Sequence, residues 1–410
     1  MVVKPGYKQT EVGVIPEDWE IEAIEKMVEA SAPICYGVVQ VGRHIENGIP
    51  IVAIKFVKEI ANSPLHRASA DIERPYTRSR VKANDVLISI KGTIGRVGVV
   101  PKGFEGNISR ELARLRLAEN YSPKYVAYQL ENPHTQERIF RAVVGTTRLE
   151  FSIATLRNFE IPIPPTTTEQ ATIAEALSDV DALIVGLDHL IAKKRNIKQA
   201  AMQELLTGKR RLPGFDRSGG KVKQIEVGAV PEDWTLDYIE NDANITTGRK
   251  NTQDRIEDGE FPFFVRSQTI ERINSYSFDG EAVLTAGDGV GTGKIFHYIK
   301  GKFDVHQRVY RISEFSERLN GYFFFLYFST HFYNRIMQMT AKSSVDSVRR
   351  EMIARMPIPL PPTIDEQVAI AAVLSDMDDE ITALEARRDK TKALKQGMMQ
   401  ELLTGKTRLV

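Results

Sequence analysis

The sequence predicts an α+β protein formed by tandem duplication, in which a mixed, mostly β globule followed by a long helix occurs twice. Three observations support this fold class. Blocks of sequence recur in both halves of the 410-residue chain, the segments ahead of each apolar repeat have the pattern of short strands, and each half ends in heptad spacing. The two long helices are expected to pack as an antiparallel coiled coil with pseudo-twofold symmetry.

The duplication is visible in three matched blocks. KQTEVGVIPEDW begins at position 8 and KQIEVGAVPEDW at position 223, so this block repeats after 215 positions (223 minus 8). IPPTTTEQATIAEALSDVD at 163 and LPPTIDEQVAIAAVLSDMD at 360 repeat after 197 positions (360 minus 163), as do the copies of MQELLTGK at 202 and 399. We expect the matched blocks to contact something common to both halves, and the diverged segments to contact two different things.

The blocks divide the chain, which is too long for one typical core, into alternating globules and helices. RRLPGFDRSGGKVKQ, which is rich in glycine, proline and charge, has the composition of a linker. The predicted parts are a first globule at 1–162, a central helix at 163–209, the linker at 210–224, a second globule at 225–359 and a C-terminal helix at 360–410.

Strand and helix patterns alternate within each globule. VLISI, RVGVV and LARLRL in the first globule, and KIFHYI and VYRI in the second, predict short strands. Asn47-Gly48 and Asp258-Gly259 predict hairpin turns just before the strands IPIVAI and EFPFFV. SPKYVAYQLENPHTQERIFRAV and RLNGYFFFLYFSTHFYNRIMQM predict a helical segment in each globule.

Heptad spacing between capping signals predicts the two long helices. Each begins after Pro-Pro with a Thr-x-x-Glu capping box and ends before a glycine suited to the left-handed C′ position, namely Thr166, Glu169 and Gly208, then Thr363, Glu366 and Gly405. About 40 residues at about 1.5 Å each give a rod of roughly 60 Å. The expected coiled-coil seam consists of Ile173, Leu177, Val180, Ile184, Leu187 and Ile191, then Ile370, Leu374, Met377, Ile381 and Leu384. The alternative, in which each helix belongs to the core of its own globule, stays open.

Composition excludes several classes of protein. No run of 18 apolar residues occurs and the N-terminus is polar, so we expect neither a membrane span nor a signal peptide, and a cytoplasmic location. The single cysteine, Cys35, excludes an internal disulfide and a cysteine-based zinc site. Between His66 and Arg116, eleven Lys and Arg stand against five Asp and Glu, which is compatible with a polyanion-binding surface or with an ordinary solvated face.

No catalytic constellation is recognisable. The seven histidines are scattered without metal-ligand spacing, and neither a nucleophile elbow nor a dinucleotide fingerprint is present. The duplicated carboxylate pairs, Glu17-Asp18 and Glu232-Asp233, are assigned a structural role near a helix base. The sequence therefore predicts no enzyme activity, metal or cofactor for this chain alone.

Two glycine-rich loops are the best candidates for contact with a phosphate backbone or with base edges. They are KGTIGRVG at 91–98 and AGDGVGTGK at 286–294, and neither is a Walker A loop. A tight hairpin inside a β domain is the alternative for either loop alone. The predicted DNA contacts are Lys91, Thr93, Arg96, Asn107, Arg110, Thr146 and Arg148 in the first globule, and Arg249, Lys250, Asp288, Thr292, Lys294, His306, Gln307, Arg308, Lys342 and Ser343 in the second.

The order of the repeated blocks resembles a known family. VGxxPxDW, then Pro-Pro followed by Glu-Gln, then a long helix ending in QELLTGK, all present twice, resemble the specificity (S) subunit of type I restriction–modification systems. The resemblance implies target recognition domains that each read one half of a bipartite, asymmetric sequence in double-stranded DNA. It also implies a coiled coil that sets the gap between the half-sites and docks two modification (methyltransferase) subunits, joined by restriction subunits for cleavage. S-adenosylmethionine, ATP and Mg²⁺ would be bound by those partners.

Two other classes of function remain open at this point. One is an orphan nuclease or methyltransferase, which a methylation assay on the chain alone would reveal. The other is a two-headed structural adaptor with a helical-hairpin scaffold, which would lack the steep salt dependence that phosphate contacts impose on DNA binding.

Overall fold

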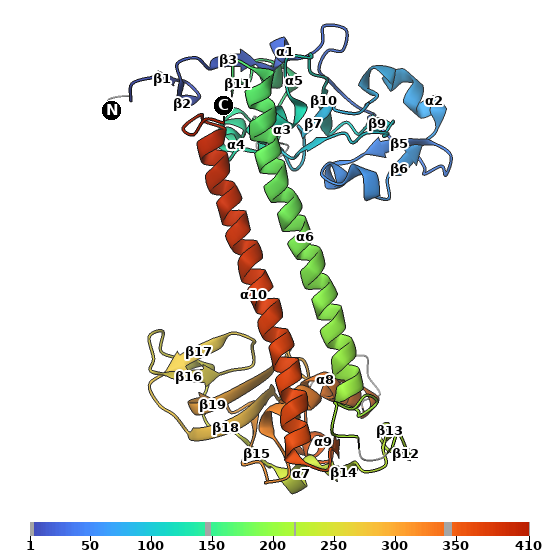
Figure 1. Ribbon diagram of the computed structural model, residues 1–410, viewed down its shortest axis with the longest axis vertical. Coiled ribbons are helices and arrows are strands. Elements are labelled where there is room, and N and C mark those ends of the chain that lie inside the picture. The colour runs from blue at the N-terminus through green and yellow to red at the C-terminus, as the bar shows by residue number, and fades with distance from the viewer. Residues whose placement is uncertain (1–3, 144–148, 217–218, 340–346, 410) are drawn as a thin grey trace. The chain divides into compact units, whose positions relative to one another are not determined.

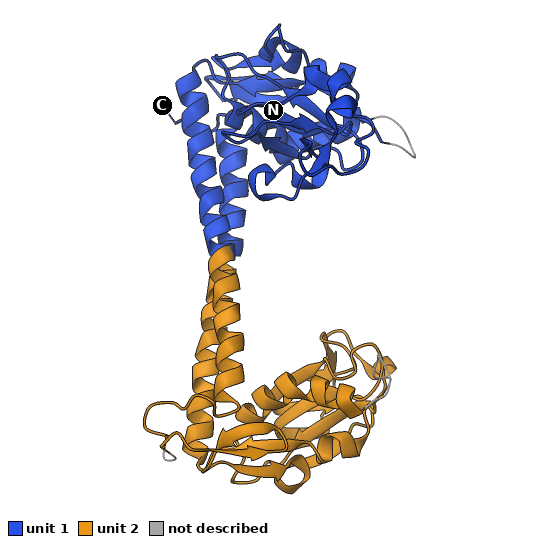
Figure 2. Ribbon diagram, turned by 90° about the vertical axis from the view of Figure 1, so that its right-hand side faces the viewer, with its two compact units in different colours: residues 1–188, 387–410 blue, residues 189–386 orange. Residues whose placement is uncertain are grey.

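The computed structural model describes residues 4–143, 149–216, 219–339 and 347–409 (Figure 1). The chain forms two compact units, coloured separately in Figure 2. Unit 1 comprises residues 1–188 and 387–410, and unit 2 comprises residues 189–386. Each unit thus contains one globular head and a segment of both long helices. The domain boundaries expected from the sequence instead treat each long helix as one undivided part, and these boundaries stay a prediction.

The head of unit 1 (residues 4–163) is built on two small sheets and two strand pairs. A four-stranded sheet has the order β4-β10-β7-β8 and a three-stranded sheet has the order β6-β5-β9, while β1 pairs with β2 and β3 with β11. The strands are β1 Tyr7–Thr10, β2 Gly13–Pro16, β3 Glu20–Ala23, β4 Cys35–Tyr36, β5 Ile49–Val52, β6 His66–Ala68, β7 Val86–Ser89, β8 Val97–Val99, β9 Asn107–Ile108, β10 Leu112–Leu115 and β11 Glu160–Ile163.

Short helices surround these sheets. They are α1 Ile24–Met27, α2 Ala70–Glu73, α3 Pro123–Glu131, α4 Pro133–Ala142 and α5 Ile153–Arg157, with 3₁₀ turns at Ile54–Phe56, Ile60–Asn62 and Arg74–Ser79. The helical segment expected after Ser122 is two helices, because Asn132 caps α4 by accepting from the His134 backbone N–H at 3.0 Å and Pro133 occupies the first turn. Trp19, Tyr125 and Leu130 lie fully buried in the core of this unit.

The head of unit 2 (residues 222–360) has a larger sheet. Its order is β15-β20-β18-β19-β16-β17, and β12 pairs with β13 and β14 with β21 outside it. The strands are β12 Val222–Ile225, β13 Gly228–Pro231, β14 Thr235–Tyr238, β15 Asn244–Thr247, β16 Phe261–Phe264, β17 Ile270–Ile273, β18 Phe278–Ala286, β19 Phe296–Val305, β20 Val309–Ser313 and β21 Pro357–Leu360. The helices are α7 Ile239–Asp242, α8 Gly321–Met339 and α9 Arg350–Ala354, with a 3₁₀ turn at Thr252–Asp254.

An aromatic core holds α8 against this sheet. Phe324, Phe328 and Phe332 stack along the buried face of α8, with ring centroids 5.3 Å and 4.4 Å apart. Phe296 of β19 meets Phe328 edge to face at 5.4 Å. Because aromatic side chains bury a large apolar area, this cluster fixes the helix on which one of the glycine-rich loops rests.

The turns expected at Asn47-Gly48 and Asp258-Gly259 form, since Gly48 N–H donates to the Ile45 carbonyl at 2.9 Å and Gly259 N–H to the Ile256 carbonyl at 3.0 Å, but they do not close hairpins. Strands β5 and β16, which follow these turns, pair with later strands, β6 and β17, and in parallel with β9 and β19. The two glycines also serve close backbone approach, because a Cβ atom would lie 2.4 Å from the Ala68 oxygen at Gly48 and 2.3 Å from the Ile273 nitrogen at Gly259.

The long helices form where the sequence predicts them. They are α6 Thr167–Leu205 and α10 Ile364–Leu402, of 39 residues each. Gly208 and Gly405 follow their ends with φ of 70° and 69°, as the C′ position requires. Among the described residues, no helix combines the length and hydrophobicity that crossing a bilayer demands.

Candidate nucleic-acid interface

The glycine-rich loop of unit 1 joins β7 to β8 and is fixed from beneath. The buried Ser89 hydroxyl donates to the Thr93 carbonyl at 2.5 Å and accepts from the Arg96 backbone N–H at 2.8 Å. Gly95 has φ of 83°, and its carbonyl accepts from Gln136 of α4 at 2.9 Å. The exposed side chains of Thr93 and Arg96 therefore project from a rigid support.

The corresponding loop of unit 2 joins β18 to β19. Gly289 and Gly293 both have positive φ, 87° and 70°. The buried Thr292 hydroxyl donates to the Gly289 carbonyl at 2.5 Å, and a Cβ on Gly293 would lie 2.3 Å from Ile336 of α8. Lys294 is exposed, with its Nζ 5.1 Å from the centre of the Tyr333 ring.

The two loops are held by equivalent backbone hydrogen bonds, which we call the shared backbone frame. Ile90 N–H donates to the Glu111 carbonyl at 2.8 Å, and in unit 2 Gly287 N–H donates to the Arg308 carbonyl at the same distance. On the other side, Phe151 N–H donates to the Ile90 carbonyl and Val348 N–H to the Gly287 carbonyl, at 2.9 and 2.7 Å. Lys91 thus corresponds to Asp288, so one head places a cation where the other places an anion.

A turn beside each loop is also equivalent between the heads. Arg110 N–H donates to the Val38 carbonyl at 2.9 Å, and Gln307 N–H donates to the Lys250 carbonyl at 2.8 Å. The side chains of Arg110 and Gln307 are both exposed. An arginine and a glutamine, which favour guanine and adenine edges respectively, therefore stand at matching positions.

Three predicted DNA contacts are buried. Asn107 is completely buried, with its amide donating to Glu73 at 2.8 Å and its oxygen accepting from Ser79 at 2.8 Å. Thr292 and His306 are 3% and 5% exposed. Thr292 bonds the loop and His306 bonds the Arg308 N–H of the turn, whereas Asn107 is held by Glu73 and Ser79, so none of the three stands at the surface.

The remaining predicted contacts fall into two groups. Thr146, Arg148, Lys342 and Ser343 lie outside the described residues. Arg249 and Arg308 are exposed, while Lys250, Lys91 and Asp288 are half-buried. Lys91 forms an ion pair with Glu150 at 3.2 Å.

Asp288 organises a cluster that the sequence patterns did not indicate. It lies 2.8 Å from Arg266 and 3.7 Å from Arg308, two exposed arginines. Gln307, next to Arg308 in the sequence, donates to Asn251. Arg266 follows β16 and is far from the loop in sequence, so only the parallel pairing of β16 with β19 brings it here.

The basic stretch of unit 1 is partly neutralised by acidic neighbours. Arg116 lies 2.8 Å from the buried Asp85, and Arg80 lies 2.6 Å from the buried Glu73. Ion pairs of any exposure involve six of the eleven cations, namely Arg74, Arg80, Lys82, Lys91, Arg110 and Arg116, and only the partners of Arg80 and Arg116 are buried. The composition of this stretch therefore overstates the positive charge that it offers to a polyanion.

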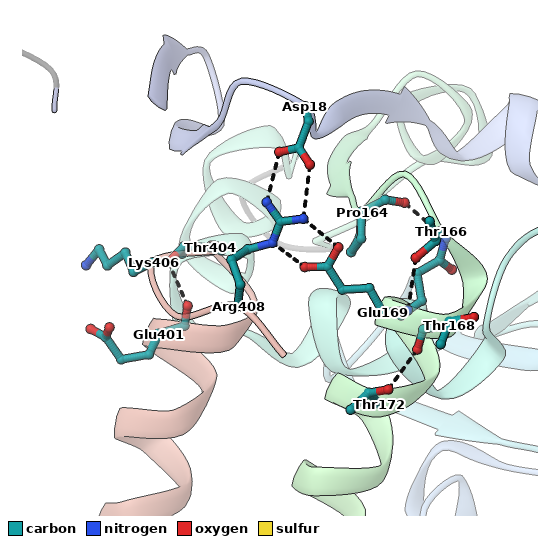
Figure 3. A network of polar contacts seen from close by, with 12 residues as sticks. Asp18, Pro164, Thr166, Thr168, Glu169, Thr172, Glu401, Thr404, Lys406 and Arg408 are labelled. Atoms are coloured by element: carbon teal, nitrogen blue, oxygen red, sulfur yellow. Dashed lines mark hydrogen bonds and ion pairs between the residues drawn. The ribbon is translucent and has the colours of Figure 1, made fainter. Parts of the chain in front are cut away.

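The repeated blocks converge on an arginine clamp in unit 1 (Figure 3). Arg408, just after α10, donates to both oxygens of Asp18 at 2.9 and 3.0 Å and to Glu169 of α6 at 2.8 Å. Its guanidinium carbon lies 5.9 Å from the centre of the buried Trp19 ring. These bonds hold the pKa of Asp18 below its usual range.

Unit 2 contains the same clamp. Arg211 donates to Asp233 at 2.8 Å and to Glu366 at 2.8 Å, with its guanidinium carbon 5.7 Å from the Trp234 ring centre. In both clamps the glutamate of the expected capping box, Glu169 or Glu366, accepts hydrogen bonds from the arginine. The threonine half of the box is present, since Glu169 N–H donates to Thr166 at 3.2 Å. The arginine shared by TGKTRL and TGKRRL is a sequence signal that could have indicated this contact, and the sequence analysis did not use it.

The glutamine of each repeated Glu-Gln pair ties a head to a long helix. Gln170 accepts from the Ser122 N–H at 2.9 Å, at the start of α3. Gln367 accepts from the Asn320 N–H at 2.9 Å and donates to the Arg318 carbonyl at 2.8 Å, just before α8. The repeated sequence blocks are thus the parts of each half that join head to helix.

Within each unit, the segments of the two long helices lie side by side. In unit 1, Lys395 lies 2.7 Å from Asp181, and in unit 2, Lys198 lies 2.5 Å from Asp378. Of the expected seam, Ile173, Leu177, Leu187, Ile191, Ile370, Leu374 and Ile381 are buried, and Val180, Ile184, Met377 and Leu384 are half-buried.

Burial lowers the pKa of three histidines in unit 2, His297, His306 and His331, and the charge of Arg266 lowers that of His306 further. Because burial disfavours the charged imidazolium in the folded state, the unfolded chain binds more protons than the folded chain as the pH falls below about 6.5. We expect unit 2 to lose stability below that pH, by up to about 1.4 kcal/mol per pH unit for each histidine.

Hydrogen exchange of unit 2 at about pH 7.5 and 5.5, corrected for the intrinsic rate, measures this loss. A variant with all three histidines replaced by glutamine should lose the pH dependence. Equal stability of the natural chain at both pH values would contradict the prediction.

Comparison with known proteins identifies a family. The type I restriction modification DNA specificity domain matches residues 16–198 and 231–395, once in each half. The type I restriction enzyme EcoBI specificity subunit of Escherichia coli is 28% identical over 204 residues, which are 48% of this chain and 42% of that protein. The type I restriction enzyme MjaVIII specificity subunit of Methanocaldococcus jannaschii is 25% identical over 423 residues, 96% of this chain and 94% of that protein.

Solved structures share the fold. The S subunit of a type I restriction–modification system from M. genitalium aligns with a TM-score of 0.61 and 14% identity over 94% of this chain and 96% of its own. A chain from a study of complex assembly and conformational transition of the type I R-M system aligns with a TM-score of 0.54 and 14% identity, over 96% and 99%. Since the family match spans most of both halves, the chain belongs to the type I restriction modification DNA specificity domain family, the family of type I specificity subunits.

Proposed function

We propose that this chain is the non-catalytic sequence-specificity subunit of a type I restriction–modification complex, in which each head reads one half of a bipartite, asymmetric DNA site. The main support is the shared backbone frame of the two heads. Equivalent hydrogen bonds hold the glycine-rich loop and the neighbouring turn in both, while the side chains on that frame differ, as at Lys91 and Asp288 or Arg110 and Gln307. A common frame with different side chains suits two readers of different half-sites.

The exposed polar side chains on this frame are the proposed DNA contacts. Arginine can donate to both guanine acceptors in the major groove, and glutamine can pair with adenine in the same way. Lysine and arginine also neutralise phosphates, which makes the binding salt-dependent. The proposed contacts are the exposed Thr93, Arg96, Arg110, Arg249, Lys294, Gln307 and Arg308, together with the half-buried Lys91 and Lys250.

The two long helices are proposed to form an antiparallel coiled coil with pseudo-twofold symmetry, which sets the gap between the half-sites and docks two modification subunits. Support comes from the ion pairs between the helix segments inside each unit and from the equal lengths of α6 and α10. Restriction subunits would join this assembly for cleavage. S-adenosylmethionine, ATP and Mg²⁺ would be bound by those partners and not by this chain.

The test is to express the chain with a modification subunit from the same organism and to map the methylated bases in the host genome. We expect one bipartite motif with a fixed gap. Replacing the head of unit 1 with that of a relative should then change only one half of the motif. A chimaera that changed both halves, or a motif without a gap, would contradict two independent readers.

A second experiment separates this function from catalysis by the chain itself. The purified chain alone, given S-adenosylmethionine and duplex DNA, should transfer no methyl groups. A structural adaptor is distinguished by adding the modification subunit and measuring DNA affinity against salt. The affinity of a specificity subunit should fall steeply as salt rises, since several phosphate contacts release counterions.

A further inference from the structure

Val290 lies at the tip of the glycine-rich loop of unit 2, between β18 and β19, and its apolar side chain is fully exposed. Glycine stands on both sides of it. Gly289 adopts φ of 87°, and a Cβ on Gly291 would lie 2.0 Å from Ile295. These conformations place the valine side chain in solvent. Packing inside the free chain therefore does not explain why an apolar residue stands at this position.

The loop beneath this tip is held firmly. The buried Thr292 hydroxyl and its backbone N–H both bond the Gly289 carbonyl, at 2.5 and 3.0 Å. Lys294 N–H donates to the Gly291 carbonyl at 3.0 Å. Presenting an exposed side chain from a fixed loop lowers the entropy lost on binding, which favours a recognition role.

Cationic side chains lie close to the loop that carries the valine. Arg266 and Arg308 are 44% and 64% exposed, and both reach Asp288 at the base of the loop. Lys294 follows on its other side. A polyanion attracted to these cations would meet an apolar group at the tip, and on the base edges of the major groove the thymine methyl is the group that suits an apolar contact.

The two heads differ at this position. In unit 1 the residue after the first positive-φ glycine, Gly92, is Thr93, which is also exposed. A threonine can bond a base edge, whereas a valine can only make an apolar contact. The difference fits heads that read different bases through the same loop.

Resting on the proposed function, we infer that Val290 makes an apolar contact with the C5-methyl group of a thymine in the major groove of the half-site read by unit 2. The thymine methyl is the apolar feature that distinguishes one base in that groove. Wedges that separate stacked bases use longer side chains such as Phe, Leu, Ile or Met. The short valine suits a methyl contact better than insertion between bases.

The test uses the chain assembled with its modification subunit and a synthetic duplex carrying the methylation motif found in the host. Each thymine of the half-site read by unit 2 is replaced in turn by uracil, which lacks only the methyl group. We expect one replacement to weaken binding about fourfold, the effect of one buried methyl-sized group. Val290→Ala should weaken binding to a similar degree and become insensitive to that replacement.

Val222→Ala is the matched control, because Val222 is an exposed valine of the same unit that lies on β12, outside the loop. It should keep the affinity and the uracil response of the natural chain. A half-site without thymine, or a Val290→Ala chain with natural affinity and response, would overturn the inference. Failure of the natural complex to bind any bipartite motif would instead refute the proposed function.

Discussion

Replacing Arg211 with alanine is expected to lower the free energy of unfolding of unit 2 by about 3–5 kcal/mol, because Glu366 would be left as a buried, unpaired charge. The side chains of Arg211 and Glu366 are 7% and 1% exposed. Asp233 would lose its cation as well. Exposed ion pairs contribute only about 0–1 kcal/mol, so burial sets the size of this effect.

Hydrogen exchange read separately on peptides of each unit measures the loss, since unit 2 should lose protection first. Arg210→Ala is the matched control, because the Arg210 side chain is 75% exposed and lies 3.9 Å from Glu204. Adding Glu366→Gln to Arg211→Ala should restore part of the stability by removing the unpaired charge. The clamp would have no stabilising role if Arg211→Ala were no more harmful than Arg210→Ala.

Replacing Trp19 with alanine should destabilise unit 1 by about 3–5 kcal/mol, the usual cost of removing a large buried aromatic side chain. Trp19 is completely buried and meets Tyr125 edge to face, with ring centroids 6.4 Å apart. A Cβ on Gly405 would lie 3.2 Å from its ring. The cavity would therefore loosen both the head and the end of α10.

Trp19→Phe tests whether an aromatic ring that fills most of this space keeps most of the stability. The indole Nε1 is buried without a hydrogen-bond partner among the described residues, so phenylalanine gives up no bond there. We expect it to cost about 1 kcal/mol, the scale of a conservative core change. Unfolding in denaturant, followed by exchange on unit 1 peptides, gives both values. Equal losses for the two variants would show that filling the core is not what matters at this position.

The long helices were predictable because their signals are local. Heptad spacing, a threonine cap and a glycine at C′ act within a few residues of one another, and α6 and α10 follow them. The mixed α+β class was also confirmed by the sheets of both heads. Strand pairing is not local. The turns at Gly48 and Gly259 were predicted correctly, but the strands that follow them pair with later strands and do not form hairpins across these turns.

The candidate site was only partly predictable from the sequence. The glycine-rich loops lie where the pattern placed them, but polar residue type does not reveal burial. Asn107 and His306 are polar and yet lie inside, where hydrogen bonds satisfy them. The contact of Arg266 with Asp288 was not predicted for a different reason. The two residues are distant in sequence, and the parallel pairing of β16 with β19 brings them together.

Unit 1 is formed by two segments that are far apart in the sequence, residues 1–188 and 387–410, and this affects the order in which the protein is made. Leu402 and Leu403 are part of its buried core, and Gln129 donates to the Leu403 carbonyl at 2.6 Å. During translation, all residues of unit 2 leave the ribosome before residues 387–410 do. The head that is synthesised first is therefore completed last, because its core gains Leu402 and Leu403 only after the whole of unit 2 has been made.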